Sequence, residues 1–403
     1  MPIFGSARLR KFLIVRLGWT MLLFLIAVIP TASQAQQTKP TASEPTPKPA
    51  IPTILAAFDK YEVVAMPEAH GMKDVDDFIL ALIRNPSFPS KVNDIEVECG
   101  NSLYQPILDR YIAGEDVPFT EVRKVWRNTT QLMCGQSGFF EQFFPVVRAI
   151  NQKLPTTKRL RVLAGDPPID WDKVKTSEEA MSIVGREASI VSVMEKELLS
   201  KHHKALMVFG TFHLMHGIDD SAVSAYEKDY PHLTFVISDL GTYDTNRSVG
   251  SISPFALWPN PSIALTKGTW LGGLSLTDVF PPGIWFDPDC NVQIALFPPR
   301  LEKQAHKPME HYIDAFLYLG PQEFRLSEPM PANIALDADY TTELRRRESL
   351  MGFPGPSKSQ KEFGDEIVQE AENPILKGAA PRPADARELR QSCLDAKKQG
   401  SPP

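Results

Sequence analysis

Strand-like and helical patterns alternate between residues 61 and 239, and this alternation restricts the possible folds more than any other feature. Short apolar runs typical of buried strands recur at Tyr61–Met66, Asn93–Cys99, Leu160–Ala164, Ala205–Gly210 and Thr234–Asp239. Helical spacing of apolar residues separates them, first at Val75, Phe78, Ile79, Leu82 and Ile83. Repeated β-α-β order with apolar strands predicts an α/β fold of three layers, with a mostly parallel central sheet covered by helices on both faces.

The predicted domain extends from residue 54 to residue 350. Its further helices are expected at Leu103–Ala113, Phe119–Leu132, Phe139–Leu154, Glu178–Leu199 and Ala222–Tyr230. Eight prolines between residues 254 and 299 then predict a long irregular insertion. Two placements fit it, a lid over the strand ends or a surface loop away from them. A strand at Tyr312–Leu319 and a helix near Tyr340–Leu350 complete the domain.

The first 35 residues are typical of an export signal. Basic residues precede an apolar stretch from Leu17 to Ile29, and Ser33-Gln34-Ala35 places small residues at a cleavage site after Ala35. The stretch is shorter than the ~20 residues that a membrane span needs. We therefore expect a cleaved signal peptide at 1–35 rather than an anchor, and a periplasmic or secreted protein without a membrane span. Residues 36–53, rich in proline and threonine, are predicted to be a linker, and residues 351–403 a flexible tail.

Composition narrows the classes of function. The whole chain has a formal net charge of −6, and loss of the four basic residues of the signal peptide makes it more acidic still. Such a chain lacks the basic surface of a nucleic-acid-binding protein, so a small-molecule substrate is the expected partner. In an oxidising compartment four cysteines can pair in three ways, and the sequence does not choose among them: Cys99, Cys134, Cys290 and Cys393.

Polar residues gather where the predicted strands end, which is where open α/β sheets bind ligands. Glu68 and His70 follow the first strand, Glu98 ends the second, Asp166 follows the third and His213 follows the fourth. Taken singly, such a histidine is more often structural, and a carboxylate there often caps a helix. Together they suit general acid–base chemistry, or a divalent metal with nitrogen and oxygen ligands.

The second strand carries three alternating carboxylates, Asp94, Glu96 and Glu98, which must point to the same face. Unpaired carboxylates on a strand buried on both faces would be costly, so partners or a cleft are required. This requirement favours a functional role for Glu98, at the end of the strand. We expect Asp94 to be exposed, and His202-His203 to form an exposed helix cap.

Three motifs resemble the erythromycin esterase-like proteins. They are Met-Pro-Glu-Ala-His-Gly at 66–71 before an amphipathic helix, Val-Glu-Cys-Gly-Asn at 97–101, and Phe-Gly-Thr-Phe-His at 209–213. That family belongs to a superfamily with the ChaN-type haem-binding lipoproteins and the Tiki/TraB metalloproteases. The resemblance covers about residues 54–320, and it implicates Glu68, His70, Glu98 and His213. One departure is Pro67, which stands where the family has glycine and removes a backbone N–H.

The esterase-like branch implies a hydrolase that acts on an ester or lactone without a serine nucleophile or a cofactor. We expect His70 to be its general base, Glu98 to hold the imidazole or the water, and His213 to stabilise the oxyanion. The chain contains no Gly-x-Ser-x-Gly motif, as this mechanism requires. Arg127, Asp166 and Asp314 lie in motifs that resemble a bacterial branch of the group, and we expect them to contact substrate.

The other two branches imply different functions. A ChaN-type protein would bind haem or another planar ligand without turnover, with His213, Met215 or His216 as axial ligand. The lipid-attachment cysteine of that branch is absent here. A Tiki-type protein would be a metal-dependent peptidase, and its ligands would be His70, Glu98 and His213. We favour the hydrolase.

Overall fold

The computed structural model describes residues 42–68, 70–183, 185–219, 221–241, 255–280, 283–287, 292–296, 307–321, 325–326, 328, 331–351 and 395. The predicted signal peptide, nearly all of the predicted tail, Cys290 and Cys393 lie outside these residues. None of the helices in the described ranges is long and apolar enough to cross a bilayer.

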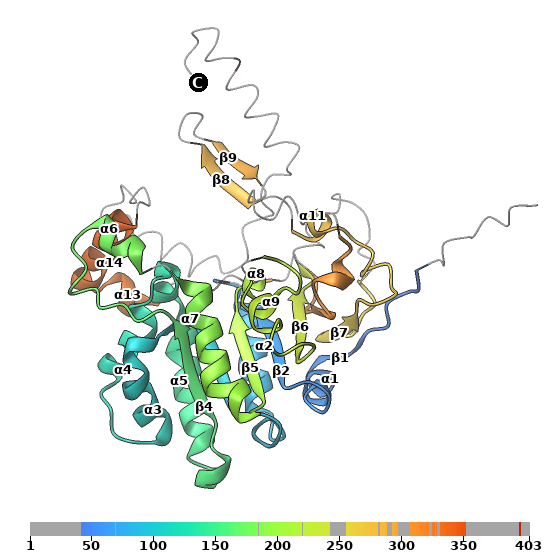
Figure 1. Ribbon diagram of the computed structural model, residues 1–403, viewed down its shortest axis with the longest axis horizontal. Helices are drawn as coiled ribbons and strands as arrows, with labels where there is room; N and C mark the ends of the chain where they lie inside the picture. Colours follow the sequence, from blue (N-terminus) through green and yellow to red (C-terminus); the bar gives the residue numbers. More distant parts are fainter. Residues whose placement is uncertain are drawn as a thin grey trace, which may run out of the picture. The chain divides into compact units, whose positions relative to one another are not determined.

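An eight-stranded sheet forms the centre of the described fold (Figure 1). Its strand order is β1-β7-β10-β6-β2-β5-β3-β4. The six strands from β10 to β4 are parallel, and β7 pairs antiparallel with both β10 and β1. The bounds are β1 Lys48–Pro49, β2 Val63–Pro67, β3 Asp94–Asn101, β4 Arg161–Asp166, β5 Ala205–Phe209, β6 Thr234–Asp239, β7 Ser262–Leu265 and β10 Ala315–Tyr318. A separate antiparallel hairpin pairs β8 (Gly283–Asp287) with β9 (Val292–Leu296).

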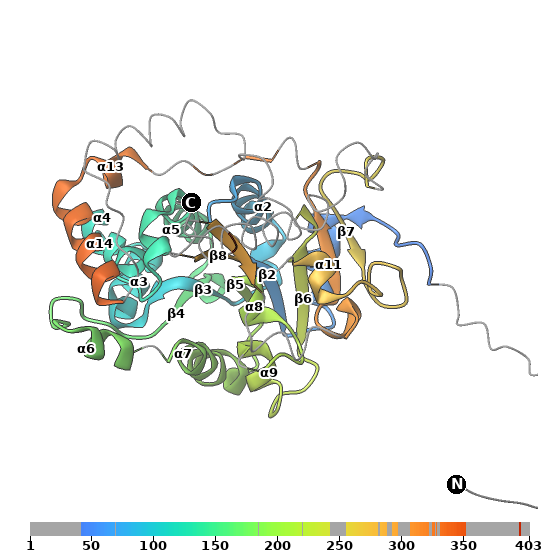
Figure 2. The ribbon, with the colours of Figure 1, turned by 90° about the horizontal axis from the view of Figure 1, so that it is seen from above.

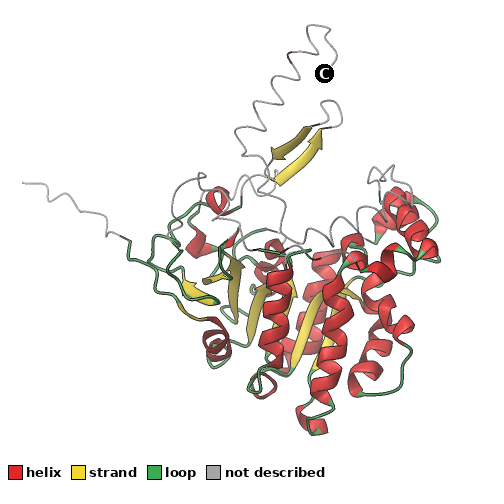
Figure 3. Cartoon of the chain, turned by 180° about the vertical axis from the view of Figure 1, so that it is seen from behind, coloured by secondary structure: helices red, strands yellow, loops and turns green. Residues whose placement is uncertain are grey.

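Helices cover both faces of the sheet, which confirms the predicted three layers (Figures 2 and 3). One buried cluster joins the sheet to the helices α1 Ala50–Ala57, α2 Lys73–Arg84, α3 Gln105–Ala113, α4 Phe119–Arg127 and α5 Gly138–Asn151. A second cluster joins the opposite face to α7 Arg186–Val193, α8 Thr211–Leu214, α9 Ala222–Tyr226 and α11 Leu276–Val279. The remaining helices are α6 Ser177–Ser182, α13 Ala332–Ala335 and α14 Ala338–Leu350.

Strand β2 shows why its sequence is apolar throughout. Val64 and Met66 pack into the first cluster, whereas Val63 and Ala65 pack into the second. Alternate side chains therefore enter different layers, and both layers are dry. The end of β2 also explains how Pro67 is tolerated. Pro67 lies opposite Phe209, and the next residue, Glu68, restores the ladder by donating its N–H to the Phe209 carbonyl at 2.9 Å.

The helix predicted over Glu178–Leu199 is wrong as a single element. It is divided into α6, α7 and a π-helical segment at Met194–Leu198. A capping box made by Thr176 and Glu179 begins α6, and Gly185 is the residue before α7. Glycine is a poor helix former, so the heptad of apolar residues on both sides does not carry the helix through this position. The interruption leaves Arg186 and Glu187 in the first turn of α7 rather than in mid-helix.

Two smaller expectations also need correction, and one is confirmed. Asp94 is buried rather than exposed, because its Oδ2 lies 2.7 Å from Nδ1 of His203. His202 is the exposed cap that we expected, with a left-handed φ of 52°. The fold begins before residue 54, since β1 pairs with β7 and α1 starts at Ala50.

The insertion predicted at 254–299 is only partly irregular. Its residues 262–265 form β7 and extend the central sheet next to β10, and 276–279 form α11. None of its described residues lines the pocket presented below. Its residues 254, 281–282, 288–291 and 297–299 lie outside the described ranges, and its role as a lid stays a prediction.

Candidate active site

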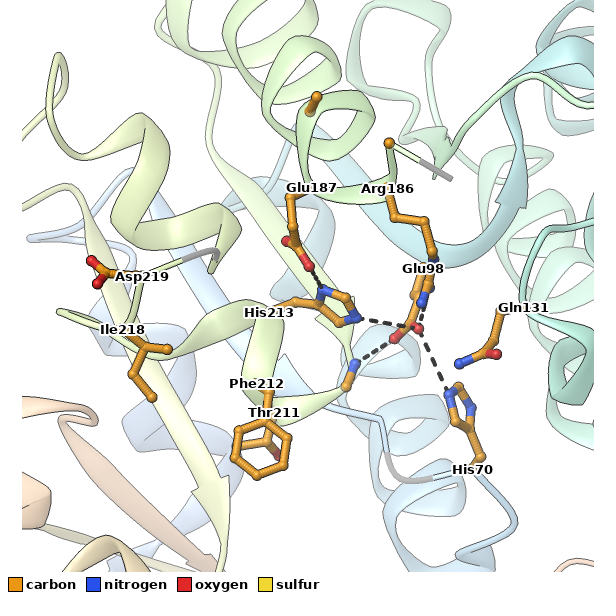
Figure 4. A pocket seen from close by; sticks show the side chains of 13 residues that line it. His70, Glu98, Gln131, Arg186, Glu187, Thr211, Phe212, His213, Ile218 and Asp219 are labelled. Atoms are coloured by element: carbon orange, nitrogen blue, oxygen red, sulfur yellow. Dashed lines mark hydrogen bonds and ion pairs between the residues drawn. The ribbon is translucent and has the colours of Figure 1, made fainter. Parts of the chain in front are cut away.

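A pocket of about 580 Å³ opens where β2, β5 and β3 end side by side (Figure 4). Three of the four residues implicated by the sequence line it, namely His70, Glu98 and His213. His70 lies in the turn between β2 and α2, Glu98 lies on β3, and His213 lies on α8 directly after β5. The parallel order β2-β5-β3 therefore brings together side chains that are far apart in the sequence.

Glu98 is the centre of this site. Its side chain is 2% exposed, and its Oε2 accepts a 2.6 Å hydrogen bond from the backbone N–H of Gly210. Its Oε1 lies 2.5 Å from Nη2 of Arg186, 3.7 Å from Nε2 of His70 and 3.6 Å from Nε2 of His213. Burial alone would raise the pKa of Glu98, but these cationic neighbours hold the pKa well below its usual range. Glu98 is therefore ionised at neutral pH.

Each histidine is held by a second carboxylate on its other ring nitrogen. Nδ1 of His70 lies 2.7 Å from Oε2 of Glu68, and Nδ1 of His213 lies 2.6 Å from Oε1 of Glu187. Both imidazoles thus present Nε2 to the same oxygen of Glu98. Such carboxylates fix the orientation of a ring and stabilise its protonated form.

Both imidazoles are cationic at neutral pH. Burial lowers the pKa of a histidine, but here the charges and hydrogen bonds of the carboxylates outweigh it. Glu68 and Glu98 raise the pKa of His70 to about 11. Glu187 and Glu98 raise the pKa of His213 to about 9. Of the two rings, His213 gives up its proton at the lower pH.

Asp166 belongs to the site, but in a different role from the expected one. It is 1% exposed and is not part of the pocket lining. It accepts hydrogen bonds from the backbone N–H and the hydroxyl of Thr130, at 2.5 and 2.6 Å, and its Oδ1 lies 3.3 Å from Nε of Arg186. Burial raises the pKa of Asp166 to about 6, against the opposing effects of Arg186 and Thr130. Asp166 therefore positions Arg186 against Glu98.

Arg127 and Asp314, also expected to contact substrate, lie elsewhere. Arg127 pairs with Glu141 at 2.8 Å and lies against the ring of Tyr340. The Oδ2 of Asp314 accepts the N–H of Val236 at 2.8 Å. Strand β10 begins only at Ala315, so Asp314 precedes the strand and does not reach its carboxyl end.

Asp314 instead belongs to a second carboxylate–imidazole cluster. Its Oδ2 lies 3.2 Å from Nε2 of His216, and Nδ1 of that ring lies 2.8 Å from Glu227. Burial lowers the pKa of His216, but Asp314 and Glu227 outweigh this effect and raise the pKa to about 9. His216 does not line the pocket of Figure 4.

Sequence reasoning missed five polar residues of the lining: Gln131, Arg186, Glu187, Thr211 and Asp219. The first three fall inside helices that the sequence predicts to be continuous. The signal that was available is Gly185, since a glycine inside an apolar heptad pattern often marks the end of a helix.

The donor atoms do not suit haem, or a metal ion held by His70, Glu98 and His213. Arg186 already occupies the Glu98 oxygen that faces both rings, and a second cation there would be repelled. For haem, His216 is engaged on both ring nitrogens, Nε2 of His213 faces the ionised Glu98 at 3.6 Å, and Met215 is fully buried. Among the described residues, one group has ligand atoms within 4.8 Å of one another, and it consists of Glu68, His70 and Cys99. The sulfur of Cys99 is bonded to Cys134 in a disulfide, which is one of the pairings that the sequence left open.

Comparison with known proteins finds weak likenesses to solved structures. No family model and no curated protein sequence matches the chain. Matching solved structures include the type III effector HopBA1, at 15% identity over 52% of this chain and 91% of that one, with a TM-score of 0.33. A variant of the erythromycin esterase EreC in its open conformation matches at 9% identity, 67% and 93% coverage and a TM-score of 0.40. ChaN of Campylobacter jejuni, with cofacially bound haem, matches at 12% identity, 50% and 87% coverage and a TM-score of 0.30.

Proposed function

We propose that this protein hydrolyses an ester or lactone of a small molecule with an activated water. The observation that supports this is the pair of clamped imidazoles, whose Nε2 atoms lie 3.7 and 3.6 Å from one oxygen of Glu98. Both separations exceed a normal hydrogen bond, so neither Nε2 is committed to Glu98. Two proton-transfer groups thus face one pocket from opposite sides of a fixed negative charge.

The charges suggest different roles for the two rings from those expected from the sequence. His213, with a pKa of about 9, is the ring that more readily becomes neutral and able to accept a proton. His70, with a pKa of about 11, stays an imidazolium at the same pH. We therefore assign the general base to His213 and the electrophile to His70.

In this mechanism neutral His213 takes a proton from water as the water oxygen attacks the carbonyl carbon. The carbonyl oxygen becomes negative, and the imidazolium of His70 stabilises it. When the ester bond breaks, the imidazolium of His213 gives its proton to the departing alkoxide. A carboxylic acid and an alcohol result, and His213 is neutral again. Glu98 stays ionised, held by Arg186 and Gly210, and stabilises the positive charge that forms on His213.

Among the described residues the pocket lining contains neither serine nor cysteine, and it has one hydroxyl side chain, that of Thr211. We propose that water is the nucleophile, activated by the imidazoles. The reaction as written uses only side chains of this chain, and we propose that it needs no metal or haem. Chelators should then leave the rate unchanged. We further propose that the protein acts in the periplasm or outside the cell, because the sequence signal and the Cys99–Cys134 disulfide both suit an oxidising compartment.

The test is hydrolysis of a panel of p-nitrophenyl esters and simple lactones by the purified protein. His70→Gln, His213→Gln and Glu98→Gln should each lower kcat by about 10²–10⁴-fold, a typical contribution of acid–base catalysis. His216→Gln is the matched control, because that ring is also clamped by two carboxylates but lies outside the pocket. Equal rates in all four variants would contradict the proposal.

The wild-type pH profile separates the two possible bases. With His213 as base, kcat/KM should rise with pH and level off near pH 9. With His70 as base, the rise should continue to about pH 11. An intact-mass measurement of the exported protein tests its expected start after Ala35.

A further inference from the structure

The Cys99–Cys134 disulfide lies beside the candidate active site. Cys99 directly follows Glu98 on β3 and is fully buried. Its sulfur lies within 4.8 Å of a ring nitrogen of His70 and of a carboxylate oxygen of Glu68. Its partner Cys134 lies in the 3-10 turn Leu132–Gln136, directly after Gln131 of the pocket lining.

This arrangement holds three different donor atoms around one point. In a tetrahedral zinc site with sulfur, nitrogen and oxygen ligands, the donor atoms stand about 3.3–3.7 Å apart, as metal–ligand bonds of about 2.0–2.3 Å require. The three donor atoms here all lie within 4.8 Å of one another, and Nδ1 of His70 is 2.7 Å from Oε2 of Glu68. Binding of an ion would therefore require these side chains to rotate.

The surroundings of Glu68 also suit a cation. Its Oε1 is buried without a hydrogen-bond partner among the described residues, and so are both carboxyl oxygens of Asp76. Burial and the charge of Glu68 raise the pKa of Asp76 to about 10. Buried carboxylate oxygens without partners are costly unless something compensates them. His70 is 18% exposed and lines the pocket, so a metal here would reach solvent through a fourth position.

We propose that Glu68, His70 and Cys99 form a binding site for a thiophilic divalent cation such as Zn²⁺ once the disulfide is open. The disulfide hides this site, because a disulfide sulfur carries no charge and a thiolate does. Opening the bond with a dithiol transfers two electrons and two protons to the protein, leaves thiols at Cys99 and Cys134, and converts the dithiol to its cyclic disulfide. Metal binding then releases the Cys99 proton and the proton shared by His70 and Glu68.

The consequence is a switch between two chemistries at one histidine. In the oxidised protein His70 is an imidazolium that faces Glu98. In the reduced, metal-bound protein the same ring is a neutral ligand and no longer a cationic electrophile. Metal binding itself does not depend on the proposed hydrolysis, and it is measured without a substrate.

The test uses Co²⁺ as a spectroscopic probe of the full-length Cys134→Ser variant, which frees Cys99 without reduction. Its fold is checked first by circular dichroism. Titration under argon should give a thiolate-to-cobalt charge-transfer band that saturates at one Co²⁺ per chain and disappears when Zn²⁺ is added. Glu68→Gln in the same background should weaken binding at least about tenfold, as expected for loss of a ligand. The oxidised wild type should show no band.

The double variant Cys99→Ser, Cys134→Ser is the matched control, since it keeps Cys290 and Cys393. A band of equal strength in the double variant would overturn the proposal, because another thiol would then be the ligand. A folded Cys134→Ser variant without a band would overturn it as well. If that variant does not fold, the wild type is reduced with a dithiol, separated from the reductant and titrated with Co²⁺ in the same way. A thiolate-to-cobalt band then supports the proposal, and its absence overturns it. If neither the wild type nor any variant hydrolysed an ester or lactone, the proposed function would be refuted, and the result of the metal titration would still hold.

Discussion

Replacing Glu98 with glutamine should lower the pKa of His213, and the structure sets the size of the effect. Oε1 of Glu98 lies 3.6 Å from Nε2 of His213. At an effective dielectric constant of about 20, opposite charges at that distance attract by about 4–5 kcal/mol, which corresponds to about three pKa units. Solvent around the partly exposed ring reduces this value, and Glu187 still holds Nδ1. We therefore expect the pKa to fall from about 9 by about one to two units.

The assay is NMR titration of the histidine side chains in protein labelled at the imidazole ring. The spectrum of His213→Gln assigns the resonance. Glu227→Gln is the control, since it should lower the midpoint of His216 and leave that of His213 in place. A wild-type midpoint of His213 near 6.5, or the same midpoint with and without Glu98, would refute the view that Glu98 controls the proton on this ring.

Three further predictions concern stability, measured by urea unfolding. Asp314→Asn should weaken the cluster around His216, whose pKa of about 9 in the folded protein exceeds the usual histidine value of 6.5. Because the folded state holds this proton more tightly, the stabilisation is complete below pH 6.5 and is lost as pH rises through 9. The variant should thus lose about 1–3 kcal/mol near pH 6 and little near pH 10, and an equal loss at both would contradict this. Arg325→Met should cost about 3–5 kcal/mol, because Arg325 is 1% exposed and its loss leaves Asp239 buried without its 2.7 Å partner. A loss below about 1 kcal/mol would mean that the pair is solvated. Replacing both Cys99 and Cys134 with alanine should lower the free energy of unfolding by about 3–4 kcal/mol, because the disulfide closes a loop with a sequence separation of 35 residues. An unchanged urea midpoint would contradict the presence of this disulfide in the native protein.

The sequence was sufficient for the parts of the fold that obey a simple period. Strand β2 and helix α2 were predicted nearly at their observed bounds, because burial on both faces or on one face leaves a clear apolar pattern. The convergence of His70, Glu98 and His213 was also predictable, since each follows or ends a strand of one parallel sheet.

What the sequence did not reveal depends on pairwise contacts between distant segments. Arg186 approaches Glu98 across 88 residues, and only the interruption of the helix at Gly185 permits it. The sequence around Asp94 does not indicate that His203 is its partner, so an exposed position was predicted for Asp94. Asp314 looked like a strand-end residue because the apolar run at 312–319 begins before its strand does. Periodicity gives the layer in which a side chain lies, but not its partner.

Strand β1 has a consequence for how the protein behaves in concentrated solution. Its two residues, Lys48 and Pro49, cover the outer edge of β7, where Leu265 is already 46% exposed. An uncovered edge strand offers its N–H and C=O groups to other molecules, whereas a lysine and a proline at the rim discourage such pairing. A protein shortened to start at Ala50 would keep α1 and the pocket residues but leave this edge of β7 unpaired. We expect such a protein to self-associate through β7, so its colloidal stability depends on residues that contribute almost nothing to the hydrophobic core.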